Sequence, residues 1–159
     1  MAKSILTAQQ SKFLSFVNTT PSLAKSFYLT GGTCLSEYYL QHRFSEDLDF
    51  FSEQEFDPTS ITILLKQNIK KLGYATMEFQ QSFNRNLYFF TFSDAYILKV
   101  EFTFYPFLRI ESIERKNNLQ IDSLKDMCVN KIFTIYQQPR GRDFYDVFVI
   151  LKKTDWQLH

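Results

Sequence analysis

The sequence predicts a domain of the α+β class, a mixed sheet flanked by helices, and three observations indicate this. The chain has 159 residues, which is enough for one hydrophobic core and short for two. Its apolar positions follow the order helix, strand, helix, strand, helix, then strands, then helices. No internal repeat or low-complexity linker divides it. We therefore expect residues 1–159 to form a single domain.

The first part of the chain predicts a helix, a strand and a second helix. Residues 7–18 carry apolar side chains at helical spacing, and Thr7 precedes them as an N-cap. The stretch FYLTGGT (27–33) predicts a short strand that runs into a glycine turn. The stretch TCLSEYYLQH (33–42) then predicts a helix opened by that turn. The Gly-Gly pair therefore lies at a strand-to-helix junction.

The middle of the chain predicts four strands and one helix. DLDFF (47–51) has the composition of a strand. Residues 58–72 form an amphipathic helical pattern that begins at a proline and is ended by Gly73. Three strand-like runs follow, at about residues 74–82, 86–93 and 95–105.

The last part predicts two helices. DSLKDMCVNKIFTIYQQ (122–138) has helical spacing and is capped by Asp122 or Ser123. RDFYDVFVILKK (142–153) predicts a final helix, although its Phe and Val content leaves a strand open.

Composition restricts the classes of protein to consider. A hydrophobic fraction of 45% with 22% charged residues is typical of a globular protein, and 18% aromatic residues predict a large aromatic core. The net charge of +1 does not indicate a nucleic-acid-binding protein, although a local basic patch stays open. Cys34 and Cys128 lack metal-ligand spacing and are expected to be small core residues in a reducing compartment. Without a secretory segment or a bilayer-length apolar run, we expect a cytoplasmic protein with no membrane contact.

Three carboxylates form the first candidate for chemistry. In a strand, residues two apart point to the same face, so Asp47 and Asp49 project together while Leu48 faces the core. The alternation in ILKVEFTF (97–104) gives Glu101 the same polar side, and it becomes a third carboxylate if the two strands are neighbours. Three such groups suit a one- or two-metal phosphoryl-transfer site. The alternative for the aspartate pair is a solvated sheet face.

The second candidate is the pair Gly31 and Gly32 at the start of a helix. Glycine there permits a positive φ and close backbone approach, and free N–H groups at a helix N-terminus can bind phosphate. Any tight turn can use two glycines, so the pair alone is weak. Followed about fifteen residues later by Asp-x-Asp, it becomes specific.

These motifs resemble a known superfamily. GGTCL followed by RFSEDLDFF resembles the first motif of the polymerase-β-like nucleotidyltransferases: strand, glycine turn, helix, and Asp-x-Asp on the next strand. The form with GGT, an Arg-x-Ser lead-in and DLDFF resembles the AbiEii/AbiGii-type toxin branch, which includes the MenT toxins. VNKIFTIYQQPRGRDFYDVFVI resembles that branch's paired signature of a lysine helix followed by an (R)DxxD helix. The resemblance covers roughly residues 26–151.

The resemblance implies a role for each matching residue. Asp47 and Asp49 would bind the catalytic metal, and Glu101 would activate the acceptor hydroxyl. One of Asp143 and Asp146, which share a helix face, would complete the catalytic set. The implied nucleotide contacts are Gly31, Gly32, Thr33, Arg43, Ser45 and Lys131, with Lys131 meeting phosphate as a point charge.

Alternatives stay open for several of these residues. Lys131 on sequence alone is equally a solvated helix lysine, and Asp143 an acid favoured by the helix dipole. Arg43 would contact phosphate or pair with Glu46 or an aspartate of the site. The remaining neighbours carry weaker expectations: Ser45 as a turn residue, His42 as a surface residue at a helix end, Arg140 and Arg142 as a solvated loop or an RNA contact.

The function that the resemblance implies is transfer of a nucleoside monophosphate from an NTP to an acceptor hydroxyl, dependent on Mg²⁺ or Mn²⁺. The acceptor would be RNA, such as the 3′ end of tRNA, and the protein would be the toxin of a toxin–antitoxin or phage-defence pair with a cognate antitoxin. The few residues after Asp146 predict a minimal or absent C-terminal helical region. The alternatives are a non-catalytic nucleotide-binding or interaction module and a nucleotidyltransferase that modifies protein.

Overall fold

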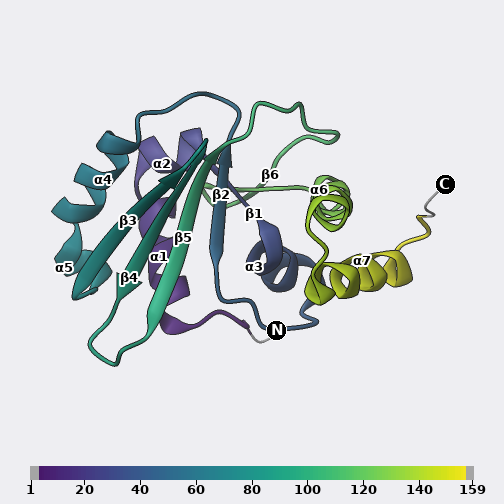
Figure 1. Cartoon of the computed structure of the whole chain (residues 1–159), viewed down its shortest axis with the longest axis horizontal. Helices are drawn as coiled ribbons and strands as arrows, with labels where there is room; N and C mark the ends of the chain where they lie inside the picture. The colour runs from purple at the N-terminus through teal and green to yellow at the C-terminus, as the bar shows by residue number, and fades with distance from the viewer. Residues whose placement is uncertain (1–3, 157–159) are drawn as a thin grey trace.

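A seven-stranded mixed sheet runs through the computed structural model, which describes residues 4–156. The strands are β1 (Tyr28–Thr30), β2 (Leu48–Ser52), β3 (Thr76–Ser82), β4 (Arg85–Thr91), β5 (Ile97–Phe104), β6 (Glu114–Lys116) and β7 (Leu119–Ile121). Their order in the sheet is β3-β4-β5-β2-β1-β7-β6 (Figure 1). The pairs β2–β5 and β1–β7 are parallel and the others antiparallel. The predicted α+β class with a mixed sheet is confirmed.

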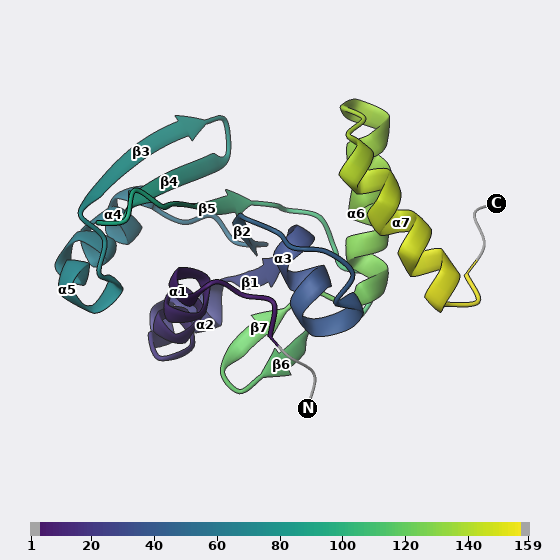
Figure 2. The ribbon, with the colours of Figure 1, turned by 90° about the horizontal axis from the view of Figure 1, so that it is seen from below.

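Helices lie on one side of the sheet and at one end of it. They are α1 (Ala8–Asn18), α2 (Pro21–Ser26), α3 (Gly31–Leu35), α4 (Pro58–Gln67), α5 (Ile69–Leu72), α6 (Leu124–Gln137) and α7 (Gly141–Lys153), with a π-helical turn, η1, at Ser36–Leu40. Figure 2 shows α1, α2, α4 and α5 together on one side, whereas α6 and α7 pack on each other beyond α3.

An aromatic core fills the space between the sheet and the first of these helix groups. Phe50 of β2 stacks on Phe102 of β5 with ring centroids 5.1 Å apart, and Phe13 of α1 lies 6.2 Å from Phe50 and 5.5 Å from Phe90. All four side chains are at most 2% exposed. Such pairs contribute roughly 0.5–1.5 kcal/mol beyond their buried area. The opposite faces of β2 and β5 are therefore left for polar residues.

Most predicted elements are present, with local differences. Thr7 caps α1 in a reciprocal capping box with Gln10, and Ser123 rather than Asp122 caps α6. The final helix is confirmed as α7 and the strand alternative is wrong. The helix predicted at 58–72 is interrupted at Asn68, whose side chain donates to the Leu64 carbonyl at 2.8 Å in competition with the backbone.

The helix predicted at 33–42 has different ends. It begins two residues earlier, because Gly31 and Gly32 form its first turn, and its second half is π-helical. It ends at Leu40, since Gln41 adopts the left-handed conformation with φ of 50°. Three short elements had no sequence prediction: α2, β6 and β7. Each has at most six residues, too few to show a hydrophobic period.

Two expectations concern the whole chain. Within residues 4–156, no helix combines the length and the apolar character that a bilayer crossing needs. Cys34 and Cys128 are free and buried, as predicted for core residues. Residues 1–3 and 157–159 of the predicted domain lie outside the described part of the chain.

Candidate functional site

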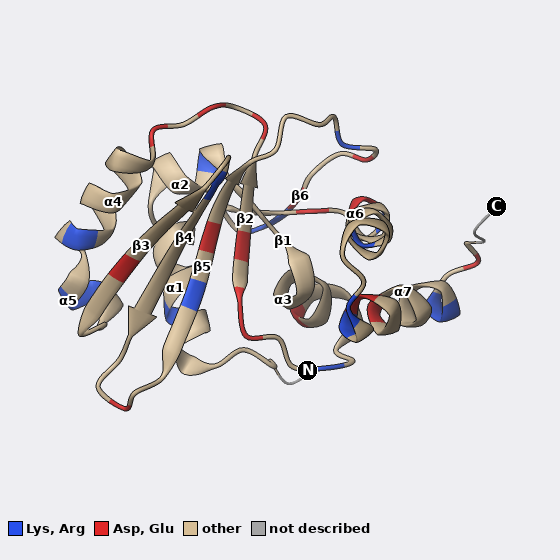
Figure 3. Ribbon diagram, viewed as in Figure 1, with Lys and Arg blue, Asp and Glu red and all other residues tan. Residues whose placement is uncertain are grey.

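A cleft of about 560 Å³ opens between the polar face of the sheet and the α6–α7 pair. Its sheet wall is built by register: β1 pairs Thr30 with Asp49, and parallel β5 pairs Glu101 with Asp49. The prediction that the Glu101 strand lies beside the Asp49 strand is therefore confirmed. Figure 3 shows these acidic positions side by side on β2 and β5, with basic residues at the start of α7 across from them.

Two of the three predicted metal ligands are paired with cations. Asp47 precedes β2 by one residue and accepts a hydrogen bond from Lys99 at 3.0 Å. Glu101 accepts two bonds of 2.7 Å from Arg85 and one of 2.7 Å from Thr103. Burial raises the pKa of Glu101, but these hydrogen bonds outweigh that effect and hold its pKa below the usual range. Glu101 is therefore ionised at neutral pH.

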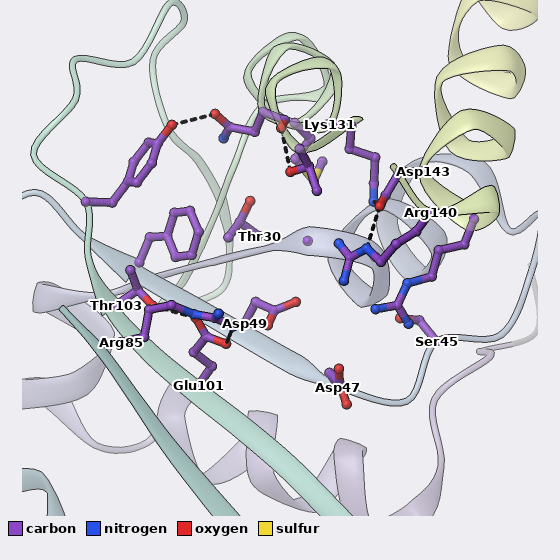
Figure 4. A pocket seen from close by; sticks show the side chains of 18 of the residues that line it. Thr30, Ser45, Asp47, Asp49, Arg85, Glu101, Thr103, Lys131, Arg140 and Asp143 are labelled. Carbon is purple, nitrogen blue, oxygen red and sulfur yellow. Dashed lines mark hydrogen bonds and ion pairs between the residues drawn. The ribbon is translucent and has the colours of Figure 1, made fainter. Parts of the chain in front are cut away.

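Asp49 is the carboxylate in this wall without a cation in contact. Burial raises its pKa to about 6, and the negative charges of Glu101 and Asp47 act in the same direction. Figure 4 shows Asp49 beside Glu101 and Arg85, across the cleft from Lys131, Asp143 and Arg140. Among residues 4–156, no three His, Cys, Asp or Glu side chains are close enough to hold a metal ion in this arrangement. The donors are nonetheless hard oxygens with excess negative charge, which fits a divalent cation such as Mg²⁺.

The raised pKa of Asp49 predicts how stability depends on pH without divalent cations. A folded-state pKa of about 6, against an ordinary 3.8, contributes stability at low pH that is lost as pH rises through 6. We expect stability to fall between about pH 4 and pH 7, by up to about 3 kcal/mol from this group. Thermal unfolding of wild type and Asp49→Asn across this range tests it. An equal pH slope in both proteins would contradict the assignment.

The glycine turn fits directly against these side chains. Gly31 has φ of +73°, and a Cβ on it would collide with the Asp49 carboxylate. A Cβ on Gly32 would lie 2.8 Å from both Arg43 Nη2 and Ser45 Oγ. Only glycine at these two positions allows the α3 N-terminus to lie against the carboxylate on one side and the guanidinium on the other. Both glycines and Ser45 line the cleft.

We expect Gly31→Ala to destabilise the protein by roughly 1–3 kcal/mol and to displace the Asp49 carboxylate. The cost comes from a left-handed backbone and from the collision with Asp49. Gly141→Ala is the matched control, because its Cβ would meet nothing within 4 Å at the start of α7. Denaturant unfolding of the two variants measures the difference. Equal midpoints would show that the turn tolerates a side chain.

The Thr33 hydroxyl, which was predicted to contact nucleotide, makes a hydrogen bond within the protein. Its side chain is buried and its hydroxyl donates to the Asp47 carbonyl, which fixes the segment that leads into β2. It does not line the cleft. The hydroxyl is thus used to position the Asp47–Asp49 segment.

A buried ionic network lies beneath the helical wall. Asp146 is fully buried and accepts hydrogen bonds from Arg43 at 2.6 and 2.7 Å, and it lies 2.7 Å from both His42 Nε2 and Lys131 Nζ. Burial raises its pKa, but these partners together lower it to about 2. The alternative that Arg43 pairs with an aspartate of the site is confirmed.

The side chains of Lys131 and His42 are both largely buried. Lys131 is 9% exposed and also donates to Asp143 at 2.8 Å, so the alternative of a solvated helix lysine is wrong. The side chain of His42 is 5% exposed and stacks on Tyr145, so the expectation of a surface residue is wrong as well. The partner of His42, Asp146, lies 104 residues away, and the partners of Lys131 lie on the next helix, α7.

The two aspartates of the last helix lie in different places. Asp143 lines the cleft and is paired with Lys131 and with Arg140, the latter at 2.8 Å. Asp146 does not line the cleft, but its carboxylate binds Arg43 and Lys131, which do. Arg140, directly before α7, and Arg142, in its first turn, are exposed and both line the cleft.

The most important residue that the sequence prediction missed is Arg85. It comes from β4, two strands from Asp49, and its pairing with Glu101 depends on a β4–β5 register that no sequence pattern specifies. Lys99 of β5, which donates to Asp47, is another. The available signal was Lys99 inside the strand run at 95–105 and Arg85 directly before the run at 86–93.

The site thus combines a helix that opens with a glycine turn and carboxylates on adjacent strands of a mixed sheet. Solved structures share the fold. JHP933 from Helicobacter pylori superposes with a TM-score of 0.65 at 20% identity, covering 92% of this chain and 68% of that one. The Megavirus polyadenylate synthase gives a TM-score of 0.59 at 16% identity, covering 89% of this chain and 30% of that one.

Sequence comparison then shows the family. Residues 13–157 match the family described as "Nucleotidyl transferase AbiEii toxin, Type IV TA system". The chain belongs to this AbiEii nucleotidyltransferase family, as its motifs predicted. An uncharacterised protein of Aquifex aeolicus (strain VF5) is 33% identical over 140 residues, which are 86% of this chain and 63% of that protein. The chain thus spans less than two thirds of this curated relative.

Proposed function

We propose that the protein transfers a nucleoside monophosphate from an NTP to an acceptor hydroxyl, with release of pyrophosphate, in a reaction that depends on Mg²⁺ or Mn²⁺. One observation carries this proposal. Asp49 and Glu101, which are register partners on β2 and β5, lie across from the helix start at Gly31–Gly32. Carboxylates that hold a cation and N–H groups that hold phosphate are the two parts that positioning a triphosphate requires. Membership of the AbiEii family supports the same chemistry.

The residues of the cleft divide the work between its two walls. Asp47 and Asp49 would hold the cation, which when bound neutralises charge on the transferring phosphoryl group. The N-terminus of α3 and Arg43, which lies against Gly32, would bind the phosphates. Glu101 is ionised and can accept the proton of the acceptor hydroxyl once that hydroxyl displaces Arg85.

Lys131 has a structural role in addition to the phosphate contact that its motif implies. It is held between Asp143 and Asp146 at 2.8 and 2.7 Å, and it lines the cleft with Asp143. We therefore assign it to fixing the helical wall and to adding positive charge near the triphosphate. Arg140 and Arg142 at the rim offer further donors to phosphate.

Membership of the AbiEii family supports a proposal for the biological setting. We propose that the acceptor is RNA, such as the 3′ end of tRNA, that the protein is the toxin of a toxin–antitoxin or phage-defence pair in the cytoplasm, and that an antitoxin is its partner. The exposed arginines at the cleft rim support an acceptor with a phosphate backbone.

One observation favours a second candidate, a module that binds nucleotide without transferring it. Lys99 and Arg85 neutralise two of the three carboxylates, and these two side-chain cations could replace the metal ions that transfer would need. Nothing in the cleft specifically favours a protein acceptor.

Incubation with each α-labelled NTP, Mg²⁺ and total RNA tests the proposal. We expect label in RNA with one or more NTPs, lost when EDTA is added. Binding of NTP with no label in RNA or protein would support the module instead, and label in protein would change the acceptor. Absence of both binding and transfer would overturn the proposal.

A further inference from the structure

A second pocket adjoins the cleft and has different chemistry. It has a volume of about 420 Å³, within the range of small-molecule sites, and it shares with the cleft the wall residues Phe51, Tyr105, Phe107, Asn130, Thr134 and Gln137. Where the cleft is lined mainly by charged and amide side chains, this pocket is lined largely by aromatic and aliphatic ones. A ligand that fills both must have an anionic part and a flat or apolar part.

Four aromatic rings form one wall of this pocket in an unbroken series. Tyr28 of β1 lies 6.1 Å from Phe51 of β2, Phe51 lies 4.8 Å from Tyr105 and Tyr105 lies 4.7 Å from Phe107. The facing wall comes from α6, where Phe133 is 59% exposed. Of these rings, those of Phe107 and Phe133 are the most exposed, and exposed aromatic rings offer stacking surfaces that every nucleobase can use.

The pocket is also lined by the polar residues Arg109, Asp122, Asp126, Asn130, Thr134 and Gln137. Tyr105 donates to Asn130 Oδ1 at 2.9 Å, which orients the Asn130 amide group at the boundary with the cleft. The Arg109 guanidinium lies 4.9 Å from the centre of the Tyr28 ring and is paired with Glu53 at 3.2 Å. Amide and guanidinium donors beside stacking rings are suited to the edge of a base.

The wall that carries Phe107 is fixed in place. Asp126 of α6 is buried and accepts hydrogen bonds from the backbone N–H groups of Ile110 and Glu111 at 2.7 and 3.0 Å. It also accepts a bond from the Ser123 hydroxyl at 2.7 Å. A buried carboxylate with three donors ties the segment after β5 to the start of α6. The pocket is therefore formed before a ligand arrives.

The pocket also lies at a suitable place relative to the carboxylates. Asp49 and Phe51 point to the same side of β2, two residues apart, which is about 7 Å along a strand. A ribose can bridge a phosphate held near Asp49 and a base held on Phe51. We infer that the pocket bounded by Phe51, Tyr105 and Phe107 binds a nucleobase, either of the NTP or of the 3′-terminal nucleotide of the RNA acceptor. This inference rests on the proposed function.

Phe107 allows a test that spares folding, because its side chain is 61% exposed. We expect Phe107→Ala to weaken binding of one base-bearing ligand about tenfold or more, the usual loss when one stacking ring is removed. Phe107→Trp should keep wild-type affinity or exceed it. Phe148→Ala on α7 is the matched control, since Phe148 is 59% exposed and lines neither pocket.

Calorimetric titrations in Mg²⁺ with four probes separate the sources of the base. The probes are NTP, inorganic tripolyphosphate, a short single-stranded RNA and the same RNA with an abasic 3′ end. If Phe107→Ala binds NTP more weakly but tripolyphosphate unchanged, the base in the pocket belongs to the NTP. If Phe107→Ala abolishes the difference in affinity between the two RNAs, the base in the pocket belongs to the acceptor.

Two other outcomes overturn proposals separately. Unchanged affinities for NTP and RNA in a folded Phe107→Ala protein would overturn the nucleobase pocket and leave the proposed function intact. A wild-type protein that binds neither NTP, tripolyphosphate nor RNA would overturn both.

Discussion

Asp49→Asn is expected to reduce nucleotidyl transfer by at least about 10²–10³-fold while the protein stays folded. The amide has the shape of the carboxylate but lacks the charge that a divalent cation needs. Asp49 also carries unfavourable charge, because burial and its acidic neighbours raise its pKa to about 6. Neutralising it should therefore keep or increase stability in metal-free buffer at neutral pH.

The measurement is transfer from labelled NTP by the variant beside a thermal unfolding curve. Asp94→Asn is the control, an exposed aspartate in the β4–β5 turn that lies outside the cleft. It should retain wild-type transfer. Wild-type transfer by a folded Asp49→Asn protein would remove Asp49 from the reaction, and lost transfer with a lowered melting temperature would indicate a structural role.

Asp146→Asn is expected to cost about 3–5 kcal/mol of stability, the largest structural effect in the chain. The fully buried carboxylate meets Arg43, Lys131 and His42, and its removal leaves these donors without their shared counter-charge. For a chain of this length that loss lowers the melting temperature by about 6–20 °C. Asp155→Asn, an exposed aspartate just after α7, should change stability by at most about 0.5 kcal/mol.

The same network predicts sensitivity to acid. Because the pKa of Asp146 is lowered to about 2 from 3.8, its stabilisation is complete above pH 4 and is lost as pH falls toward 2. The expected loss is about 2 kcal/mol, absent in Asp146→Asn. If the variant melts with the wild type at neutral pH, or loses stability equally in acid, the network does not hold the helical wall.

Local signals in the sequence predicted much of the fold. Thr7 and Gly73 mark helix ends by their own chemistry, and the alternation around Leu48 and Val100 assigns each strand an apolar face. The carboxylates of the cleft followed from the same alternation, and the glycine turn from its position before a helix. These features depend on residues close together in the chain, so a sequence pattern contains them.

What the sequence could not predict depends on residues far apart. Arg85 reaches Glu101 through strand pairing, and Arg43 reaches Asp146 across 103 positions. The burial of Lys131 and the use of the Thr33 hydroxyl within the protein follow from such contacts. A motif identifies these residues as present but does not say which partner each one has.

The separation between Arg43 and Asp146 has a consequence for synthesis on the ribosome. The Arg43 guanidinium that lies against Gly32 is fixed by a carboxylate translated 103 residues later, and the Lys131 ammonium by the same helix. A nascent chain in which β1 to β5 have left the ribosome therefore has the carboxylates of the sheet wall but lacks α6 and α7. Such long-range pairing is slow to form, and it closes only after α7 has left the exit tunnel. The Arg43–Asp146 and Lys131–Asp146 ion pairs therefore form only after α7 has been translated.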